Sequence, residues 1–277
     1  MGRLESKQNG LSLSVGHAAR LRWIAGWVGL LAASASWAVP LACATQPPDL
    51  AAWWSGEDNP LDRLGSYPGT LDHGTGYGTG FVARAFQFDG IDDSMRVGFL
   101  GGIGLTESDP VSIAAWANTS TAATATLQVI AGNYMGEQGG SGKFSMYLMI
   151  NNGNLVFSVD QRQLAGISLS TPISDGWHFV TATYDGTALA LYVDGEARGS
   201  NTRNFTGADA NTRGWTVGNF SDETNAGHGY NSSFNGLIDE VTLFGRALSL
   251  AEIGSIFGAG AAGICTPTIF ANGFEGI

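Results

Sequence analysis

The stretch WHFVTATYDGTALALYVDG, residues 177–195, decides the local structure of this chain. Two apolar runs flank Asp185-Gly186, and a second Asp-Gly pair closes the segment. Asp-Gly between alternating apolar residues predicts a β-hairpin, because both residues tolerate the positive φ angles of a tight turn. In Trp177–Tyr184 neither alternating face is strongly polar, which predicts a strand covered on both sides.

Similar runs fill the chain after residue 50. Phe86 and Phe88 alternate toward one side, as residues of a strand that faces a core do. Asn152-Gly153 predicts a two-residue turn. Many short strands with few helices are typical of a sandwich or a barrel. The other β-branched or aromatic runs predict strands at 111–118, 126–133, 143–150, 154–160, 214–220 and 236–246.

One helix is predicted at residues 249–260. Ser249 is followed three residues later by Glu252, which forms a capping box, and two glycines near the end terminate the helix. Two polar, glycine-rich stretches, 136–142 and 221–231, predict long loops, where functional residues are common.

The composition restricts the classes of partner. The chain has 277 residues, of which 44% are hydrophobic and 13% charged, against about 25% charged in ordinary domains. The formal net charge is -11, and residues 1–38 contribute +3 of it, so the remainder carries -14. Such a surface repels phosphate backbones, which excludes nucleic-acid binding. It suits divalent cations or neutral ligands.

Residues 1–38 are predicted to be a signal peptide. Arg20 and Arg22 precede the apolar stretch IAGWVGLLAASASWA, which ends in small residues. Cleavage after Ala35, Ala38 or Ala44 fits the pattern. A membrane anchor is the alternative, but the uninterrupted run of about fifteen residues is short of the ~20 that span a bilayer; a lipoprotein is a minor option. We therefore expect a secreted protein, extracellular, periplasmic or on the cell surface, with no membrane span after removal of the signal.

The two cysteines, Cys43 and Cys265, flank nearly everything that is predicted to fold. In an oxidising compartment two such thiols are expected to pair. Two free thiols are the alternative, as is loss of Cys43 with the signal if cleavage follows Ala44.

Five segments in this order resemble one family. They are LAAWWSGEDNPLDRLGSYPGTL, ARAFQFDGIDDSMRVG, VSIAAWAN, WHFVTATYDGTALALYVDGE and FNGLIDEVTLFGRALSLAEI. Together they resemble the laminin-G-like, concanavalin A-like lectin domain of secreted bacterial proteins, over residues 43–265. The resemblance implies an all-β fold, a two-sheet antiparallel jelly-roll sandwich with one short C-terminal helix, and it also implies cysteines at the two ends of the domain. The tail 266–277 contains IFANGFE, which resembles a terminal signature of exported proteobacterial proteins.

The tryptophans of these segments are expected in the core rather than as sugar platforms. Aromatic side chains bury ~150–250 Å² each and dominate β cores. The residues concerned are Trp53, Trp54, Trp116 and Trp177.

The chemistry of a hydrolase is missing from the sequence. Glycosidases need two carboxylates ~5–5.5 Å or ~6.5–9.5 Å apart across the scissile bond. No E-x-D-x-x-E pattern is present, and the adjacent pairs Asp92-Asp93 and Asp239-Glu240 are expected to point to opposite faces of a strand. The sequence also lacks H-E-x-x-H, G-x-S-x-G and the phosphate-binding G-x-x-x-x-G-K-[ST]. We therefore expect no catalytic residues and no enzyme.

Calcium is a candidate structural ion. It takes 6–8 oxygen ligands, and acidic turns supply them. The resemblance implies a calcium held by carbonyls and by an Asp of the last strand, where Asp239 stands. Asp58 and Asp62 lie in the family's first loop and are further candidates. The alternative is that Asp239 only accepts hydrogen bonds from nearby backbone.

The fold-level expectation is a secreted, non-catalytic binding module, with carbohydrate as its ligand. The alternative is a structural or adhesive domain that binds a protein at the cell surface, and the third option is a glycan-active hydrolase with unusual catalytic residues. Aromatic and amide side chains suit stacking and hydroxyl recognition. The residues expected at the rim of the binding face are Asn133, Tyr134, Trp215, Asn219, His228 and Tyr230.

Overall fold

The computed structural model divides the chain into two units, Met1–Val39 and Pro40–Ile277. It describes residues 42–100, 106, 109–124, 127–133, 144–161, 164–202, 214–220 and 232–266, all of them in the second unit. The predicted signal segment and residues 267–277 of the tail lie outside the described residues. Within the described part, no helix is long and apolar enough to cross a membrane.

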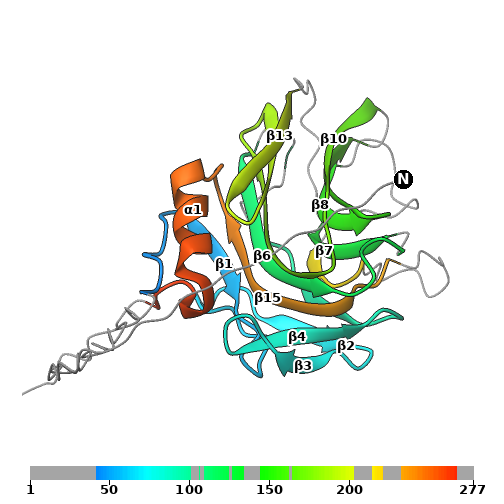
Figure 1. Ribbon diagram of the computed structural model, residues 1–277, viewed down its shortest axis with the longest axis vertical. Helices are drawn as coiled ribbons and strands as arrows, with labels where there is room; N and C mark the ends of the chain where they lie inside the picture. Colours follow the sequence, from blue (N-terminus) through cyan, green and yellow to red (C-terminus); the bar gives the residue numbers. More distant parts are fainter. Residues whose placement is uncertain are drawn as a thin grey trace, which may run out of the picture. The chain divides into compact units, whose positions relative to one another are not determined.

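Two antiparallel sheets face each other in the second unit (Figure 1). The eight-stranded sheet has the order β13-β12-β11-β6-β15-β4-β3, with β1 paired to β15, and the seven-stranded sheet has the order β10-β9-β8-β7-β14-β5-β2. This confirms the expected all-β jelly-roll sandwich.

The strands of the eight-stranded sheet are β1 (Leu50–Trp54), β3 (Gly76–Thr79), β4 (Arg84–Asp89), β6 (Val111–Thr119), β11 (Gly176–Tyr184), β12 (Ala188–Val193), β13 (Glu196–Thr202) and β15 (Asn235–Phe244). Those of the seven-stranded sheet are β2 (Gly69–Asp72), β5 (Ser94–Val97), β7 (Gln128–Gly132), β8 (Phe144–Asn151), β9 (Asn154–Gln161), β10 (Leu164–Pro172) and β14 (Trp215–Val217). Helix α1 (Leu250–Ala259) and the short η1 (Gly260–Ala262) follow.

The predicted tight turns are present. Asp185 Oδ1 accepts hydrogen bonds from the backbone N–H groups of Thr187 and Ala188, which fixes the β11–β12 turn and lowers the pKa of Asp185. Asn152-Gly153 joins β8 to β9, and Asp194-Gly195 joins β12 to β13, with both residues of each pair at positive φ. The Asn-Gly and Asp-Gly signals are therefore confirmed.

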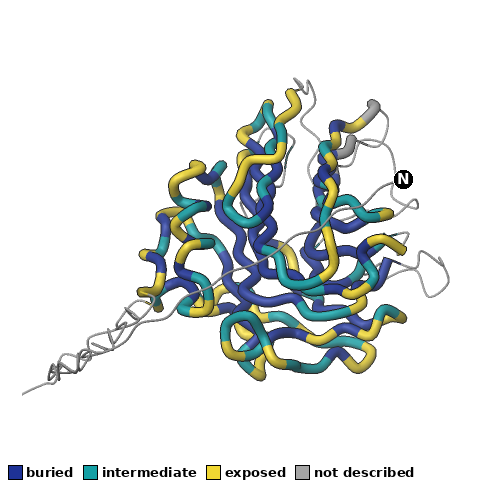
Figure 2. The backbone as a smooth tube through the Cα atoms, in the orientation of Figure 1, coloured by how far each residue is buried: buried dark blue, intermediate teal, exposed yellow. Residues whose placement is uncertain are grey.

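Strand β11 is covered on both faces, as predicted. Val180 and Ala182 pack in the core between the two sheets, while Phe179 packs on the other side with Ile253 and Ile256 of α1. The helix thus covers the outer face of the eight-stranded sheet (Figure 1). Figure 2 shows the buried inner strands, with exposed residues at edges and turns.

The predicted capping box and the core tryptophans are confirmed. Ser249 Oγ accepts a hydrogen bond from Glu252 N, and Glu252 Oε2 accepts one from Ser249 N. The helix ends at Ala259, and its C-cap residue Gly260 has φ 53°. Of the four tryptophans, Trp53, Trp54 and Trp116 are buried, and Trp177 is partly buried against the cluster under α1.

The expected disulfide joins the two ends of the domain. Cys43 and Cys265 are bonded, with their Cα atoms 5.0 Å apart. Ala44 N donates to Gly263 O at 2.8 Å, and Cys265 N donates to Ala44 O at 2.8 Å. The covalent link therefore reinforces a short ladder between the terminal segments.

Candidate functional site

Strand β15 changes partner along one of its edges. Residues 235–238 pair with β4 and residues 241–244 pair with β1, while β6 runs along the other edge. At this change Glu240 has φ 53°, and the register shifts between Asp239 and Thr242. Such a β-bulge interrupts the alternation of side chains.

The bulge places two carboxylates on one side of the strand. Ile238 and Val241 both pack in the core between the sheets, so Asp239 and Glu240 face away from that core. The expectation that these neighbours point to opposite faces is therefore wrong, because it assumed an unbroken strand.

Both carboxylates are buried. Asp239 Oδ2 accepts a hydrogen bond from Val82 N at 2.8 Å, and Glu240 Oε2 accepts one from the indole Nε1 of Trp53 at 2.9 Å. Asp239 Oδ1 is buried with no hydrogen-bond partner among the described residues. A Cβ at Gly80 would lie 2.7 Å from Asp239 Oδ2, so glycine leaves the room that this carboxylate occupies.

Burial sets the electrostatics of this pair. It raises the pKa of Asp239 to about 7, and burial together with the charge of Asp239 raises the pKa of Glu240 to about 8. The carboxylate of Glu57 repels both groups, and the charge of Arg63 partly opposes the effect on Glu240. At neutral pH the pair therefore favours a bound proton or a bound cation.

The other two predicted metal ligands have different surroundings. Asp58 is exposed, and its Oδ1 lies 3.0 Å from Arg84 Nη2. Asp62 is buried and accepts hydrogen bonds from four backbone N–H groups, those of Trp53, Leu64, Ser66 and Tyr67. Asp62 therefore stabilises the conformation of its own loop. The residue of that loop whose charge raises the pKa of Asp239 is Glu57.

Asp58, Asp62 and Asp239 do not form a group of neighbouring carboxylates within the described part of the chain. The group found there consists of Asp89, Asp92 and Asp93, whose carboxylate oxygens lie within 4.8 Å of one another. The sequence shows three aspartates within five residues, which could have indicated this group. It was not predicted, because the adjacent Asp92 and Asp93 were expected to point to opposite faces of a strand.

Two of the six predicted rim residues, Trp215 and Asn133, are buried rather than exposed at a rim. Trp215 is 2% exposed and packs in the core between the sheets, because β14 turns Trp215 and Val217 inward. Asn133 is 1% exposed, and its Oδ1 accepts a hydrogen bond from Met146 N at 2.7 Å. Asn219 is partly exposed. Tyr134, His228 and Tyr230 lie outside the described residues.

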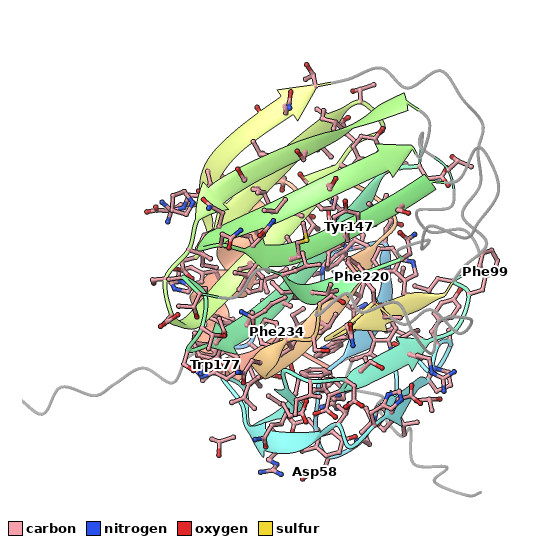
Figure 3. All side chains as sticks on the ribbon, turned by 90° about the vertical axis from the view of Figure 1, so that its right-hand side faces the viewer. Asp58, Phe99, Tyr147, Trp177, Phe220 and Phe234 are labelled. Atoms are coloured by element: carbon pink, nitrogen blue, oxygen red, sulfur yellow. A yellow bond between two sulfur atoms is a disulfide. The ribbon has the colours of Figure 1, made fainter. Side chains whose placement is uncertain are left out.

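An aromatic pair that the sequence did not reveal lies on the outer face of the seven-stranded sheet. Met146 and Leu148 of β8 face the core, so Tyr147 between them faces outward. The ring of Tyr147 meets that of Phe220 edge to face, with centroids 5.5 Å apart (Figure 3). Gly132 of β7 is opposite Tyr147, where a Cβ would lie 2.7 Å from the Tyr147 Cβ. The alternation in KFSMYLMI is enough to predict that Tyr147 faces outward. Its contact with Phe220 cannot be predicted from the sequence, because the two residues are far apart in the chain.

The same face carries an ion pair. Arg96 on β5 stands between the inward-facing Met95 and Val97, so its guanidinium lies on the outer side. It donates two hydrogen bonds to Asp72 of β2, at 2.5 Å and 2.8 Å. A bidentate partner of this kind neutralises the guanidinium and fixes its plane.

A hydrogen-bonded Ser–His–Asp chain lies at the start of β11. Ser174 Oγ is 2.8 Å from His178 Nε2, and His178 Nδ1 is 2.8 Å from Asp194 Oδ2. This order of groups occurs in serine hydrolases. Asp194 Oδ1 also accepts a hydrogen bond from Phe179 N, so the chain ties the β10–β11 connection to the β12–β13 turn and has a structural role without any substrate.

Comparison with known proteins places this geometry in a family. Residues 89–254, more than half of the chain, match the family model described as the concanavalin A-like lectin/glucanases superfamily. No curated protein matches the chain in sequence.

Three solved structures illustrate the similarity in fold. The binding domain of Paraclostridial Mosquitocidal Protein 1 has 19% identity and a TM-score of 0.57, covering 76% of this chain and 52% of that one. Domain 4 of AbnA, an extracellular arabinanase from Geobacillus stearothermophilus in complex with arabinotriose, has 19% identity and a TM-score of 0.54, covering 74% and 97%. The botulinum neurotoxin serotype D ligand binding domain, in complex with N-acetylneuraminic acid, has 18% identity and a TM-score of 0.55, covering 76% and 50%.

The chain thus spans about half the length of the toxin domains and nearly all of the arabinanase domain. These similar structures are binding domains of toxins and a domain of a glycosidase. At these identities the likeness shows the fold alone.

Proposed function

The chain belongs to the concanavalin A-like lectin/glucanases superfamily, and on that premise we propose that it is a secreted, non-catalytic carbohydrate-binding module. The ligand is a glycan, bound on the outer face of the seven-stranded sheet. The observation that carries this proposal is the Tyr147–Phe220 aromatic pair on that face.

The chemistry of the face favours a neutral sugar. Aromatic rings present flat apolar surfaces to the C–H faces of a pyranose or furanose, and Tyr147 adds a hydroxyl for hydrogen bonding. The guanidinium of Arg96 is already paired with Asp72, so it offers little unneutralised charge to an acidic sugar. Of the similar domains, one was solved with the neutral sugar arabinotriose and another with the acidic sugar N-acetylneuraminic acid, so these ligands support a sugar but do not select its charge.

Burial of a carboxylate pair supports a binding role rather than hydrolysis. Among the described residues, one pair of neighbouring carboxyl groups has strongly raised pKa values. Asp239 and Glu240 are 0% and 6% exposed. A glycosidic bond needs carboxyl groups on both of its sides, within reach of the sugar. This buried pair is closed to such a substrate.

Export is supported by the disulfide between Cys43 and Cys265. Disulfides persist in oxidising compartments. The proposed location is therefore outside the cytoplasm, with glycan as the partner; a protein at the cell surface is the alternative partner.

We further propose that the Asp239–Glu240 pair holds a structural calcium ion. Calcium prefers oxygen ligands and carboxylate charge, and the unpartnered Asp239 Oδ1 offers such an oxygen. Glu240 and the nearby Glu57 supply further negative charge. When bound, the ion would neutralise buried charge. It would also hold the β3–β4 connection at Val82 against the bulge of β15.

Replacing Tyr147 with alanine is expected to weaken glycan binding at least tenfold, a loss of about 1.4 kcal/mol. The reason is that the substitution removes one stacking surface and leaves Phe220 without its edge-to-face partner. A glycan array on the folded protein identifies the ligand, and titration calorimetry with that glycan measures the change.

The matched control is Tyr147→Phe, which keeps the ring and is expected to retain most of the affinity. An array without glycan hits, combined with capture of a cell-surface protein, would replace this proposal with the adhesive alternative. Release of reducing sugar from a glycan, or ester hydrolysis lost in Ser174→Ala, would contradict the non-catalytic assignment.

A further inference from the structure

Three aspartates converge at the turn between β4 and β5. Asp89 is the last residue of β4, and Asp92 and Asp93 precede β5. One carboxylate oxygen of each lies within 4.8 Å of the other two. Asp89 and Asp92 are exposed, whereas Asp93 is only 4% exposed. The three negative charges are therefore close together, one of them nearly excluded from water.

Hydrogen bonds hold this turn in one shape. Asp93 Oδ2 accepts from Asp89 N at 2.9 Å, and Asp89 Oδ1 accepts from Ile91 N at 2.7 Å. Ser233 Oγ donates to Ile91 O at 2.8 Å, which fixes the turn from the neighbouring segment. The carboxylates are thus positioned in advance of any ligand.

The second oxygen of Asp93 has no hydrogen-bond partner. Asp93 Oδ1 is buried, and none of the described residues donates to it. A buried acceptor without a donor is costly and rare in folded proteins, and a bound ion is one of its ordinary explanations. A Cβ at Gly74 would lie 3.5 Å from this oxygen, an ordinary contact distance.

Like charges lie beside the buried carboxylate of Asp93. Burial, followed by the charges of Asp89 and Asp92, raises the pKa of Asp93. A cation at the turn would offset the repulsion among the three carboxylates.

We propose that Asp89, Asp92 and Asp93 bind a calcium ion at the β4–β5 turn, at a site separate from the Asp239–Glu240 pair. The three side chains offer only oxygen ligands, which selects hard cations over zinc or copper. The exposure of Asp89 and Asp92 leaves room for water to complete the 6–8 ligands of calcium, with a flexibility that magnesium does not accept. Because β4 and β5 belong to opposite sheets, the ion ties the two sheets at this crossing.

The test is titration calorimetry with calcium chloride and metal-free protein, carried out in the Asp239→Asn variant so that the other proposed site does not contribute. We expect one saturable binding event, with Kd of about 10⁻⁴–10⁻³ M as in extracellular modules. Asp92→Asn in the same background is expected to weaken binding at least tenfold. Asp92 is exposed and no hydrogen bond to its side chain is found in the described part, so this variant is expected to fold.

The control is Glu196→Gln, which changes the net charge equally at an exposed side chain of β13 and should leave calcium affinity unchanged. Asp93→Asn is a second variant and should also lose affinity. The proposal is overturned if calcium gives no saturable binding, if Asp92→Asn binds as tightly as Glu196→Gln, or if zinc binds more tightly than calcium. None of these outcomes depends on glycan binding.

Discussion

Replacing Cys43 and Cys265 together with serine is expected to lower the free energy of unfolding by about 4–5 kcal/mol. The two residues are 222 positions apart, so the disulfide removes a large share of the chain entropy of the unfolded state. At ~2–4 °C per kcal/mol for a domain of this size, the melting temperature should fall by roughly 10 °C or more.

Denaturant unfolding of the wild type and the double variant measures this difference. A reducing agent should destabilise the wild type by a similar amount and leave the double variant unchanged. If the two proteins unfold at the same denaturant concentration, the hydrogen bonds of Ala44 with Gly263 and Cys265 hold the termini without the covalent link.

In a chelating buffer, the free energy of unfolding is expected to fall as the pH is raised from about 5 to about 8. The pKa values of Asp239 and Glu240 are raised to about 7 and about 8 in the folded protein, from 3.8 and 4.5. Folding therefore favours their protonated forms. That stabilisation is complete below the unfolded pKa values and is lost as the pH rises through the folded ones.

The expected size of this loss follows from the shift. One pKa unit corresponds to about 1.4 kcal/mol, so a shift of roughly three units in one carboxyl is worth on the order of 4 kcal/mol. Glu240→Gln keeps an acceptor for the indole N–H of Trp53 and carries no charge, so it should flatten the profile. The control Glu196→Gln alters an exposed carboxylate and should leave the profile unchanged. Equal stability at pH 5 and pH 8 in the wild type would show that both carboxyls ionise normally.

Calcium should reverse the effect of high pH at this pair, because the ion binds deprotonated carboxylates. At a hundredfold excess over Kd the ion adds about 2.7 kcal/mol, a melting shift of roughly 5–10 °C that should be larger at pH 8 than at pH 6. Measured in the Asp92→Asn background, the shift should shrink in Asp239→Asn. Equal melting temperatures in calcium and in chelator would exclude calcium from the pair, and an undiminished shift in Asp239→Asn would show that another residue binds it.

The sequence by itself determined the local structure. The turns at Asp185-Gly186 and Asn152-Gly153, the capping box of Ser249, and the two covered faces of β11 were all predicted. Each depends on residues that are close in sequence and on the fixed periods of strands and helices. The pairing of Cys43 with Cys265 was also predicted, since the two cysteines flank the segments that fold.

The weakly patterned strands were not predicted. Strand β13 is exposed along almost its whole length and carries little apolar alternation. Strands β2 and β3 have four residues each, contain glycine, and also show little apolar alternation. They become strands because a neighbouring strand offers an unpaired edge, which their own residues do not encode.

Only the tertiary structure decided the candidate sites. Asp239 and Glu240 share one side because β15 exchanges β4 for β1 at that point, and an adjacent pair in an unbroken strand would diverge. Trp215 is buried because β14 lies inside the sheet between β5 and β7. Tyr147 meets Phe220 because two distant segments cross the same face. A period-2 pattern fixes which residues share a face, but which partner lies beside that face, and therefore which groups are buried or charged together, depends on strand pairings between residues far apart in the chain.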